Sequence, residues 1–128
     1  MNFGNRRLPT GFQVQRGEIR FVNFDPSLGS EANKRRPAVI VSNDHANTIA
    51  ERLGRGVLTV VPLTTNTARV FPFHVFLEAS ETGLTQDSKA QAEQLRSVSI
   101  ERIGKPVGKI STAQMYELDE ALRLHLGL

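Results

Sequence analysis

Alternating apolar and polar residues predict two strands in the first third of the chain. Residues 18–25 alternate between the two classes and slip by one place after Phe21, which is typical of a strand with a β-bulge. Residues 37–41 form an uninterrupted apolar run, as expected of a strand buried on both faces. The polar segment between them, residues 27–36, is long for a compact domain, so it is our first candidate for a functional loop.

Three further strands are predicted downstream. Residues 57–61 are rich in β-branched residues, and we expect this strand to stop at Pro62, because proline cannot donate a ladder hydrogen bond. Residues 70–77 place apolar side chains on both faces, and their proline favours an edge or a strand start. A short strand is predicted over residues 107–110. Residues 47–56 are polar and interrupted by glycine, so no regular element is predicted there.

The clearest helix signal lies at the end of the chain. Ser111 is followed three residues later by Gln114, which matches a capping box, and Ile110 with Met115 matches a hydrophobic staple. Gly127 predicts the C-terminal end of the helix. The side chains expected to be buried on one face are Met115, Leu118, Leu122 and Leu126.

The secondary structure of residues 88–99 is ambiguous from the sequence. The composition of this segment favours a helix, but its apolar residues match neither the spacing of a helix nor that of a strand. Several short strands, one terminal helix and no βαβ alternation indicate a small barrel or a strongly bent sheet. We expect one domain over residues 16–128. Residues 1–15 show little periodicity and are expected to form a loose N-terminal extension that contributes little to the core.

Composition narrows the class of protein. A chain of 128 residues with 39% hydrophobic and 23% charged residues is typical of a single globular domain. The absence of cysteine excludes disulfides, a thiol nucleophile and thiolate-ligated metal sites. No apolar run approaches the roughly 20 residues of a membrane span, and the first residues lack the apolar core of a secretory signal, so a cytoplasmic protein is expected. The net charge of +3 permits a polyanionic partner without indicating one.

Motifs for nucleoside triphosphates, dinucleotides, zinc proteases and the serine nucleophile elbow are absent from the sequence. The three histidines, His45, His74 and His125, stand far apart in unlike contexts. Each is therefore expected to have a structural or surface role rather than to form a paired-histidine nuclease site.

Two polar clusters remain as candidates for chemistry. Lys34, Arg35 and Arg36 directly precede a buried strand, so at least one cation is held close to rigid scaffold and suits a phosphate; a solvated charge run is the alternative. Residues 64–67 form a hydroxyl-rich turn after another strand. Their hydroxyl groups could serve a phosphoryl oxygen if Arg36 lies nearby.

A series of linked segments resembles the MazF/PemK family of toxins. The match runs in order from Arg16 to Leu128 and is far more specific than any single motif. Its segments are residues 16–19 (RGEI), 24–31 (FDPSLGSE), 36–44 (RPAVIVSND), 60–66 (VVPLTTN), 71–73 (FPF), 83–84 (GL), 87–90 (DSKA), 93–98 (EQLRSV) and 118–122 (LDEAL).

The resemblance implies a mainly β fold with a C-terminal α-helix, an SH3-like barrel of the PemK/CcdB superfamily, with residues 90–98 as a strand. It implies the toxin of a type II toxin–antitoxin system, an endoribonuclease that cleaves single-stranded RNA at specific sequences and so inhibits translation and growth. The family needs no metal or other cofactor, because the RNA 2′-hydroxyl attacks the phosphate to leave a 2′,3′-cyclic phosphate and a 5′-hydroxyl end. The implied partners are single-stranded RNA, a cognate antitoxin protein and a second copy in a homodimer, with no membrane.

The resemblance also assigns residues. Arg36 and Thr64 match the family's catalytic pair: the guanidinium would stabilise charge and pass a bound proton to the leaving 5′-oxygen, and the hydroxyl would donate to a non-bridging oxygen. Arginine is a poor general base, so Glu31 is our hypothesis for that role, with an ordinary surface glutamate as the alternative. The candidates for RNA binding are Ser30, Lys34, Asn43, Arg69, Gln94 and Arg96.

Two other readings stay open. The chain could be a non-catalytic binder like the fold-related CcdB gyrase poisons, although those end in Trp-Gly-Ile, whereas this chain ends in residues 125–128 (HLGL) and contains no tryptophan. It could also act purely through interaction, since the family implies an antitoxin whose acidic, disordered segment folds across the RNA groove.

Overall fold

The computed structural model describes residues 13–24 and 35–128. Within them, seven strands form an antiparallel sheet in the order β4-β5-β3-β2-β1-β7, and β6 pairs with β3 off this path. The strands are β1 (Glu18–Asn23), β2 (Arg35–Ile40), β3 (Val57–Thr64), β4 (His74–Leu77), β5 (Ser88–Gln91), β6 (Arg96–Ser99) and β7 (Ile103–Lys109). The helices are α1 (Asp44–Leu53), α2 (Ala79–Thr82) and α3 (Thr112–Leu126), with 3-10 turns η2 (Ala92–Gln94) and η3 (Ile100–Arg102).

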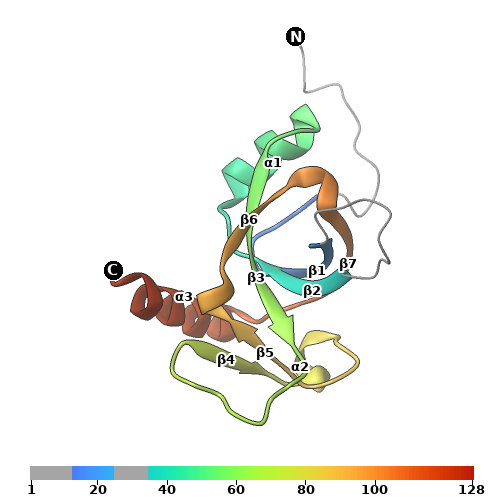
Figure 1. Ribbon diagram of the computed structural model, residues 1–128. Coiled ribbons are helices and arrows are strands. Elements are labelled where there is room, and N and C mark those ends of the chain that lie inside the picture. Colours follow the sequence, from blue (N-terminus) through green and yellow to red (C-terminus); the bar gives the residue numbers. More distant parts are fainter. Residues whose placement is uncertain (1–12, 25–34) are drawn as a thin grey trace.

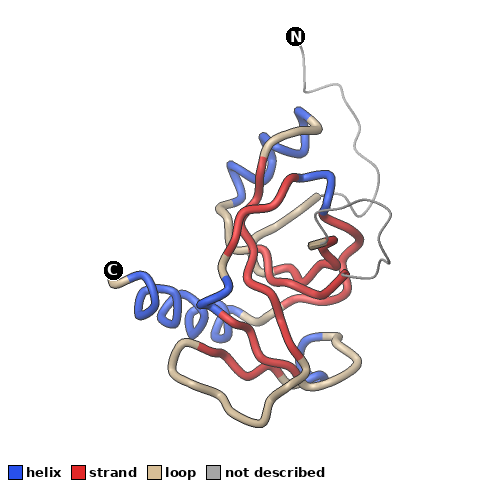
Figure 2. The backbone as a smooth tube through the Cα atoms, viewed as in Figure 1, coloured by secondary structure: helices blue, strands red, loops and turns tan. Residues whose placement is uncertain are grey.

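Strand β3 is the central element because it has partners along both edges. One edge pairs with β2, while the other pairs first with β6 over residues 57–60 and then with β5 over residues 63–64. The change of partner bends the sheet, and in Figures 1 and 2 the strands curl round with α1 near one end and α3 beside β4 and β5 near the other. The predicted mainly β, barrel-like fold with a C-terminal helix is confirmed.

Two hydrophobic clusters cover the two faces of β2 and β3. Val39 and Val61 belong to one cluster, which α3 closes through Leu118. Ala38 and Val60 belong to the other. The uninterrupted apolar run at residues 37–41 is therefore explained as predicted, because alternate side chains enter different cores.

Strand β3 continues through Pro62, so the prediction that this proline ends the strand is wrong. Val41 N–H donates to Thr59 O at 2.9 Å, which means that odd-numbered residues of β3 face β2. The nitrogen of Pro62 therefore faces the other edge, in the gap between the pairing with β6, which ends at Val60, and the pairing with β5, which starts at Leu63. The missing N–H costs no ladder hydrogen bond there.

Residues 44–53 form α1, which the sequence pattern did not predict. The helix begins at Asn43, whose side chain accepts from Ala46 N, and ends at Gly54, which has a left-handed φ of 67°. Its buried residues are Asn47 and Ala50, so its buried face lacks the large apolar side chains by which helices are usually recognised.

Other element boundaries also differ from the predictions. Only His74–Leu77 of the expected strand 70–77 is extended, because a turn joins Phe71 and His74 through the bond from His74 N to Phe71 O at 2.8 Å. The segment 88–99 is neither a helix nor one strand: β5 and β6 are separated by η2. The short strand predicted at residues 107–110 starts earlier, as β7. The β-bulge of β1 is present as register shifts against β7 on both sides of Arg20.

The capping box of α3 is confirmed. Ser111 Oγ accepts from Gln114 N at 3.0 Å, and Gln114 Oε1 accepts from Ser111 N at 2.8 Å. The predicted apolar stripe is correct at Leu118, which is fully buried, and Met115 and Leu122 pack partly buried against the same cluster, but Leu126 is 51% exposed. Ala121, which was not predicted, is buried in that cluster.

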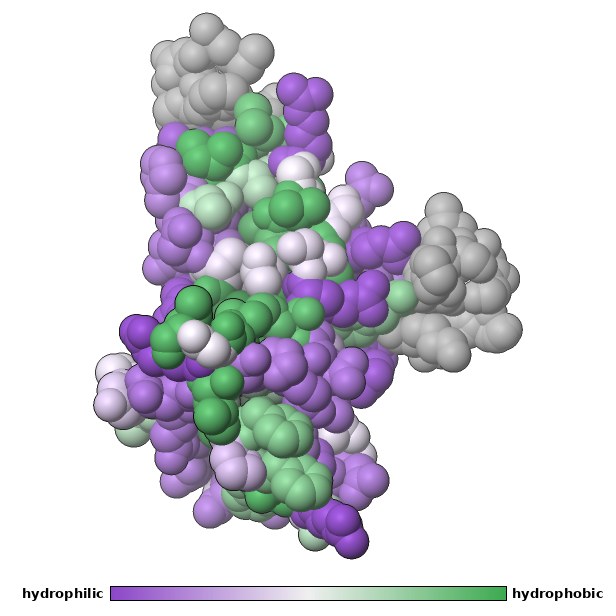
Figure 3. Space-filling model, turned by 60° about the vertical axis from the view of Figure 1, so that its left-hand side comes forward, coloured by the Kyte–Doolittle hydropathy of each residue, from purple (hydrophilic) through white to green (hydrophobic). Residues whose placement is uncertain are grey.

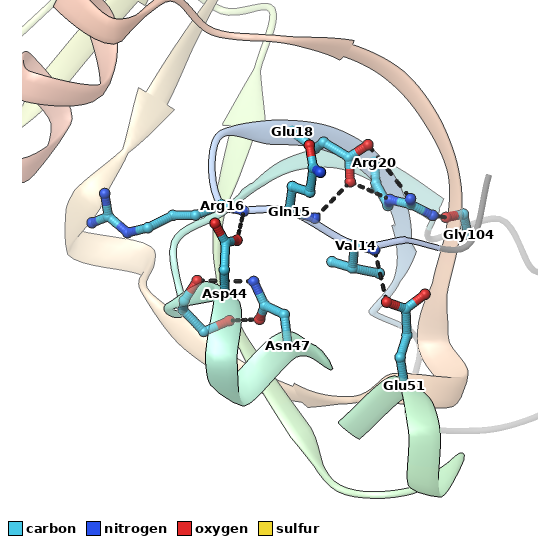
Figure 4. A network of polar contacts seen from close by, with 10 residues as sticks. Val14, Gln15, Arg16, Glu18, Arg20, Asp44, Asn47, Glu51 and Gly104 are labelled. Atoms are coloured by element: carbon cyan, nitrogen blue, oxygen red, sulfur yellow. Dashed lines mark hydrogen bonds and ion pairs between the residues drawn. The ribbon is translucent and has the colours of Figure 1, made fainter. Parts of the chain in front are cut away.

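The segment before β1 is tied to the domain by the polar contacts drawn in Figure 4. Residues 1–12 of the predicted extension lie outside the described residues, but Val14 is 3% exposed and packs in the second cluster, unlike the loose segment expected. Its N–H donates to Glu51 at 2.9 Å, while Arg16 N donates to Asp44 at 2.7 Å. These two hydrogen bonds hold the segment before β1 against α1.

Candidate active site

A polar cavity of about 280 Å³ opens where β2, β3 and β6 meet. Of the lining residues that the structure describes, two carry guanidinium groups, two carry carboxamides and none is acidic, so the cavity favours an anion. The lining residues are Phe24, Arg36, Pro62, Gln91, Gln94 and Arg96.

The register of β2 and β3 directs Arg36 into this cavity. Ala38 is paired with Pro62, and continuing the antiparallel register by two residues places Arg36 opposite Thr64. Alternate residues of a strand point to opposite faces, so Arg36 shares the face of Pro62. Its Nη2 donates to the backbone O of Leu63 at 3.3 Å, which fixes one side of the guanidinium.

The neighbouring cation has a different environment. Arg35 points to the opposite face of β2, where its guanidinium carbon lies 6.0 Å from the centre of the Phe21 ring. Only Arg36 of these two arginines lines the cavity. The alternation of the strand therefore divides the basic cluster that the sequence shows as one run.

Thr64 ends β3 and is half-buried next to Arg36 by register. Its Oγ1 accepts from Asn66 N at 3.2 Å, which closes the predicted hydroxyl-rich turn. Thr64 does not line the cavity itself, but its strand partner on the other edge is Lys89 of β5. Thr64 therefore lies beside Arg36 by strand register, while its side chain is outside the lining of the cavity.

A flat surface on one side of the cavity is formed by Arg96 and Phe24. The guanidinium carbon of Arg96 lies 4.9 Å from the centre of the Phe24 ring, and Arg96 is held on β6 opposite Val60. Gln94 approaches from η2 between β5 and β6. Stacked aromatic and guanidinium planes are surfaces on which nucleobases stack.

Arg69 and Asn43 are not part of this group. Arg69 lies in the exposed loop after β3, and its backbone O accepts from Lys89 Nζ at 2.6 Å. Asn43 caps α1 beyond the end of β2, seven positions along the chain from Arg36, and does not line the cavity. Three other predicted residues, Ser30, Glu31 and Lys34, lie outside the described residues.

The sequence reasoning did not single out Phe24, Gln91 or Lys89 as site residues. Lys89 is 8% exposed, and its bond to the Arg69 carbonyl anchors the loop that follows Thr64. The signal available in the sequence was the alternation of β5, which places Lys89 and Gln91 on one face. That signal becomes usable only once β5 is known to pair with β3.

The histidines stand apart from the cavity lining. His74 accepts from Phe71 N at Nδ1, 3.0 Å away, and its Nε2 lies 3.2 Å from Glu93 Oε2, so both ring nitrogens have structural partners. His45 and His125 are exposed. In the described part of the chain, no three histidine or acidic side chains cluster as metal ligands would, and no helix has the length and apolar character needed to cross a bilayer.

Comparison with known proteins connects this site to a family. The model of the PemK-like, MazF-like toxins of type II toxin–antitoxin systems matches residues 15–126. The chain is 60% identical over 115 residues to endoribonuclease MazF9 of Mycobacterium tuberculosis, covering 90% of this chain and 98% of that protein. It is 30% identical to endoribonuclease MazF of Staphylococcus epidermidis, covering 90% and 92% of the two chains.

Solved structures show the same fold. MazF of Deinococcus radiodurans superposes with a TM-score of 0.72 at 24% identity, covering 91% of this chain and 99% of that one. A MazE–MazF complex from the same organism superposes with a TM-score of 0.71 at 24% identity, covering 91% and 99%. The chain therefore belongs to the PemK-like, MazF-like family of type II toxins, and by enzyme class it is an endoribonuclease.

Proposed function

We propose that this toxin cleaves single-stranded RNA at specific sequences, without a metal ion, at the cavity that contains Arg36. The observation that carries the proposal is the placement of Arg36 and Thr64 by the β2–β3 register, with the guanidinium fixed to the Leu63 carbonyl. A scissile phosphate bound there would meet a cation and a hydroxyl from two adjacent rigid strands.

The chemistry requires little covalent participation by the protein. The RNA 2′-oxygen attacks phosphorus, the bond from phosphorus to the 5′-oxygen breaks, and the products are a 2′,3′-cyclic phosphate and a 5′-hydroxyl end. Arg36 stabilises the extra negative charge and passes one of its own N–H protons to the leaving 5′-oxygen, while Thr64 donates to a non-bridging oxygen. Glu31, which lies outside the described residues, stays our hypothesis for the base that takes the 2′-hydroxyl proton.

Base recognition is assigned to the side chains around the phosphate. Phe24 and Arg96 offer a stacking plane, and the carboxamides of Gln91 and Gln94 each offer one donor and one acceptor side to a base edge. The other proposed RNA-binding residues are Ser30, Lys34, Asn43 and Arg69.

A second copy of the chain is proposed to cover an apolar groove between β4 and α3. The groove has a volume of about 620 Å³ and is lined by residues such as Phe76, Tyr116 and Leu124, which are 41%, 65% and 58% exposed. Figure 3, which turns the C-terminal end of α3 forward, shows hydrophobic side chains gathered on this side of the molecule. Large apolar side chains exposed together and bordered by polar ones, here Glu117 and Glu120, are typical of a protein interface, so we expect a homodimer.

The proposed protein partner is an antitoxin. The Deinococcus structures contain MazF together with MazE, and the cavity of the present chain carries two guanidinium groups and no acidic lining residue among those described. An acidic, disordered antitoxin segment would therefore compete with RNA for Arg36 and Arg96. The proposed location of both proteins is the cytoplasm.

The experiment is cleavage of a long single-stranded RNA by purified protein in the presence of EDTA, with the ends mapped and their phosphates identified. Arg36→Ala should reduce kcat about 100-fold or more, as expected when one preorganised donor is removed. Arg55→Ala is the matched control, because Arg55 is exposed in the turn after α1 and does not line the cavity. Unchanged cleavage by a folded Arg36→Ala protein would refute the assignment. RNA binding without any cut ends would favour the non-catalytic reading instead.

A further inference from the structure

The anchor of Arg36 depends on a feature of its neighbour in the chain. Within the β2–β3 ladder, Val41 N donates to Thr59 O, so odd-numbered residues of β2 direct their N–H groups toward β3. The ladder pairs Ala38 with Pro62, and continuing the same register by one residue places Pro37 opposite Leu63. Pro37 therefore occupies a position whose N–H would donate to the backbone O of Leu63.

Proline has no N–H, so that hydrogen bond cannot form. Leu63 is 2% exposed, and a buried carbonyl without a partner is unfavourable. The carbonyl accepts instead from Nη2 of Arg36, at 3.3 Å. The side chain of one residue thus replaces the backbone donor that the next residue lacks.

We propose that Pro37 is a positioning residue for the proposed catalytic guanidinium, because its missing N–H reserves the Leu63 carbonyl as the anchor of Arg36. The inference rests on the proposed function of Arg36. It explains why the proline directly follows the arginine in the sequence, which packing alone does not explain. A residue with an N–H at position 37 would compete for the same oxygen and release the guanidinium into more rotamers.

The first test is Pro37→Ala, which restores an N–H without adding bulk. We expect kcat for RNA cleavage to fall about tenfold while KM stays within about twofold, since misplacing a catalytic group lowers the rate more than it weakens binding. The protein should be no less stable to heat than the wild type, because a ladder hydrogen bond is gained. Pro37→Val, which favours a strand still more strongly, should give the same kinetic result.

A purely structural role is separated by coupling and by spectroscopy. Arg36→Ala should cost about tenfold less in the Pro37→Ala background than in the wild type, because the guanidinium is already displaced there. Nitrogen-15 relaxation of the Arg36 side chain should show greater mobility in Pro37→Ala, and the new amide at position 37 should exchange slowly with solvent. Pro106→Ala is the matched control, since Pro106 is an exposed strand proline on β7 that pairs with Arg20; it should change neither rate nor coupling.

The outcomes distinguish the proposed catalytic role of Arg36 from the proposed positioning role of Pro37. If Arg36→Ala cleaves RNA at the wild-type rate, the proposed function fails, whatever Pro37 does. If Arg36→Ala is slow but Pro37→Ala and Pro37→Val keep the wild-type kcat, only the positioning role is overturned. Additive effects of the two substitutions, with an unchanged Arg36 side-chain mobility, would overturn it as well.

Discussion

Among the glycines that the structure describes, Gly108 should be the one at which substitution by alanine destabilises the protein most. An ideal Cβ at Gly108 would lie 1.9 Å from the backbone O of Thr82, whereas real Cβ atoms essentially never approach closer than 3.0 Å. The two segments must therefore separate by about 1 Å. Both contacting groups are backbone, and Thr82 is 4% exposed at the end of α2, so no flexible side chain can give way.

The free energy of unfolding should fall by about 3 kcal/mol, at the upper end of the usual range for overpacking. For a domain of this size, that corresponds to a fall in Tm of about 10 °C at fixed protein concentration. Gly54→Ala is the control: Gly54 has a φ of 67° and nothing within 4 Å of its added Cβ, so only backbone strain of about 1 kcal/mol applies.

Thermal unfolding followed by circular dichroism measures both variants. A Tm for Gly108→Ala within 2 °C of the wild type, or a larger loss for Gly54→Ala, would refute the reasoning that the contact between α2 and β7 is rigid (threshold set at roughly 0.5 kcal/mol). Gly108 does not line the polar cavity, so the variant should still cleave RNA at low temperature, where it stays folded.

The remaining predictions concern stability. Leu118→Ala should cost 2–5 kcal/mol (an order-of-magnitude range), because Leu118 is fully buried where α3 meets the sheet; a change in urea midpoint too small to measure would count against that packing. Ser111→Ala should cost about 1 kcal/mol by breaking the capping box, which the same titration checks, and an unaltered midpoint would contradict it. Burial raises the pKa of Glu51 above 4.5, against the lowering effect of its bond from Val14 N. The folded state therefore holds this proton more tightly, so the wild type should gain stability relative to Glu51→Gln as the pH falls through the range just above 4.5, and a parallel pair of stability curves would exclude the burial effect.

The alternation of side chains predicted most of the fold because the apolar strands obey it. Residues 37–41 are apolar on both faces and lie between two clusters, and the capping box of α3 is written in Ser111 and Gln114. Helix α1 escaped prediction because Asn47 and Ala50, rather than large apolar residues, form its buried face. The end of β3 was predicted wrongly because a proline is accommodated inside this strand only where its nitrogen faces the gap between β6 and β5. That gap arises from tertiary pairing and is not visible in the sequence.

The candidate site was predictable only in part. Arg36 and Thr64 could be named from the family resemblance, and continuing the β2–β3 register from the pair of Ala38 and Pro62 places them opposite each other. Phe24 and Gln91 reach the cavity only because the strands curl, so their contribution depends on contacts between segments far apart in sequence. No local pattern carries that information.

The hydrogen bond from Arg36 to Leu63 has a consequence for protein design. In this sheet, an arginine followed by a proline at a hydrogen-bonded position leaves the carbonyl of Leu63 on the partner strand free to accept from the guanidinium, a design that could be tried on other antiparallel strands that tolerate the proline. Two consecutive residues of one strand are therefore enough to hold a guanidinium at the surface of the sheet.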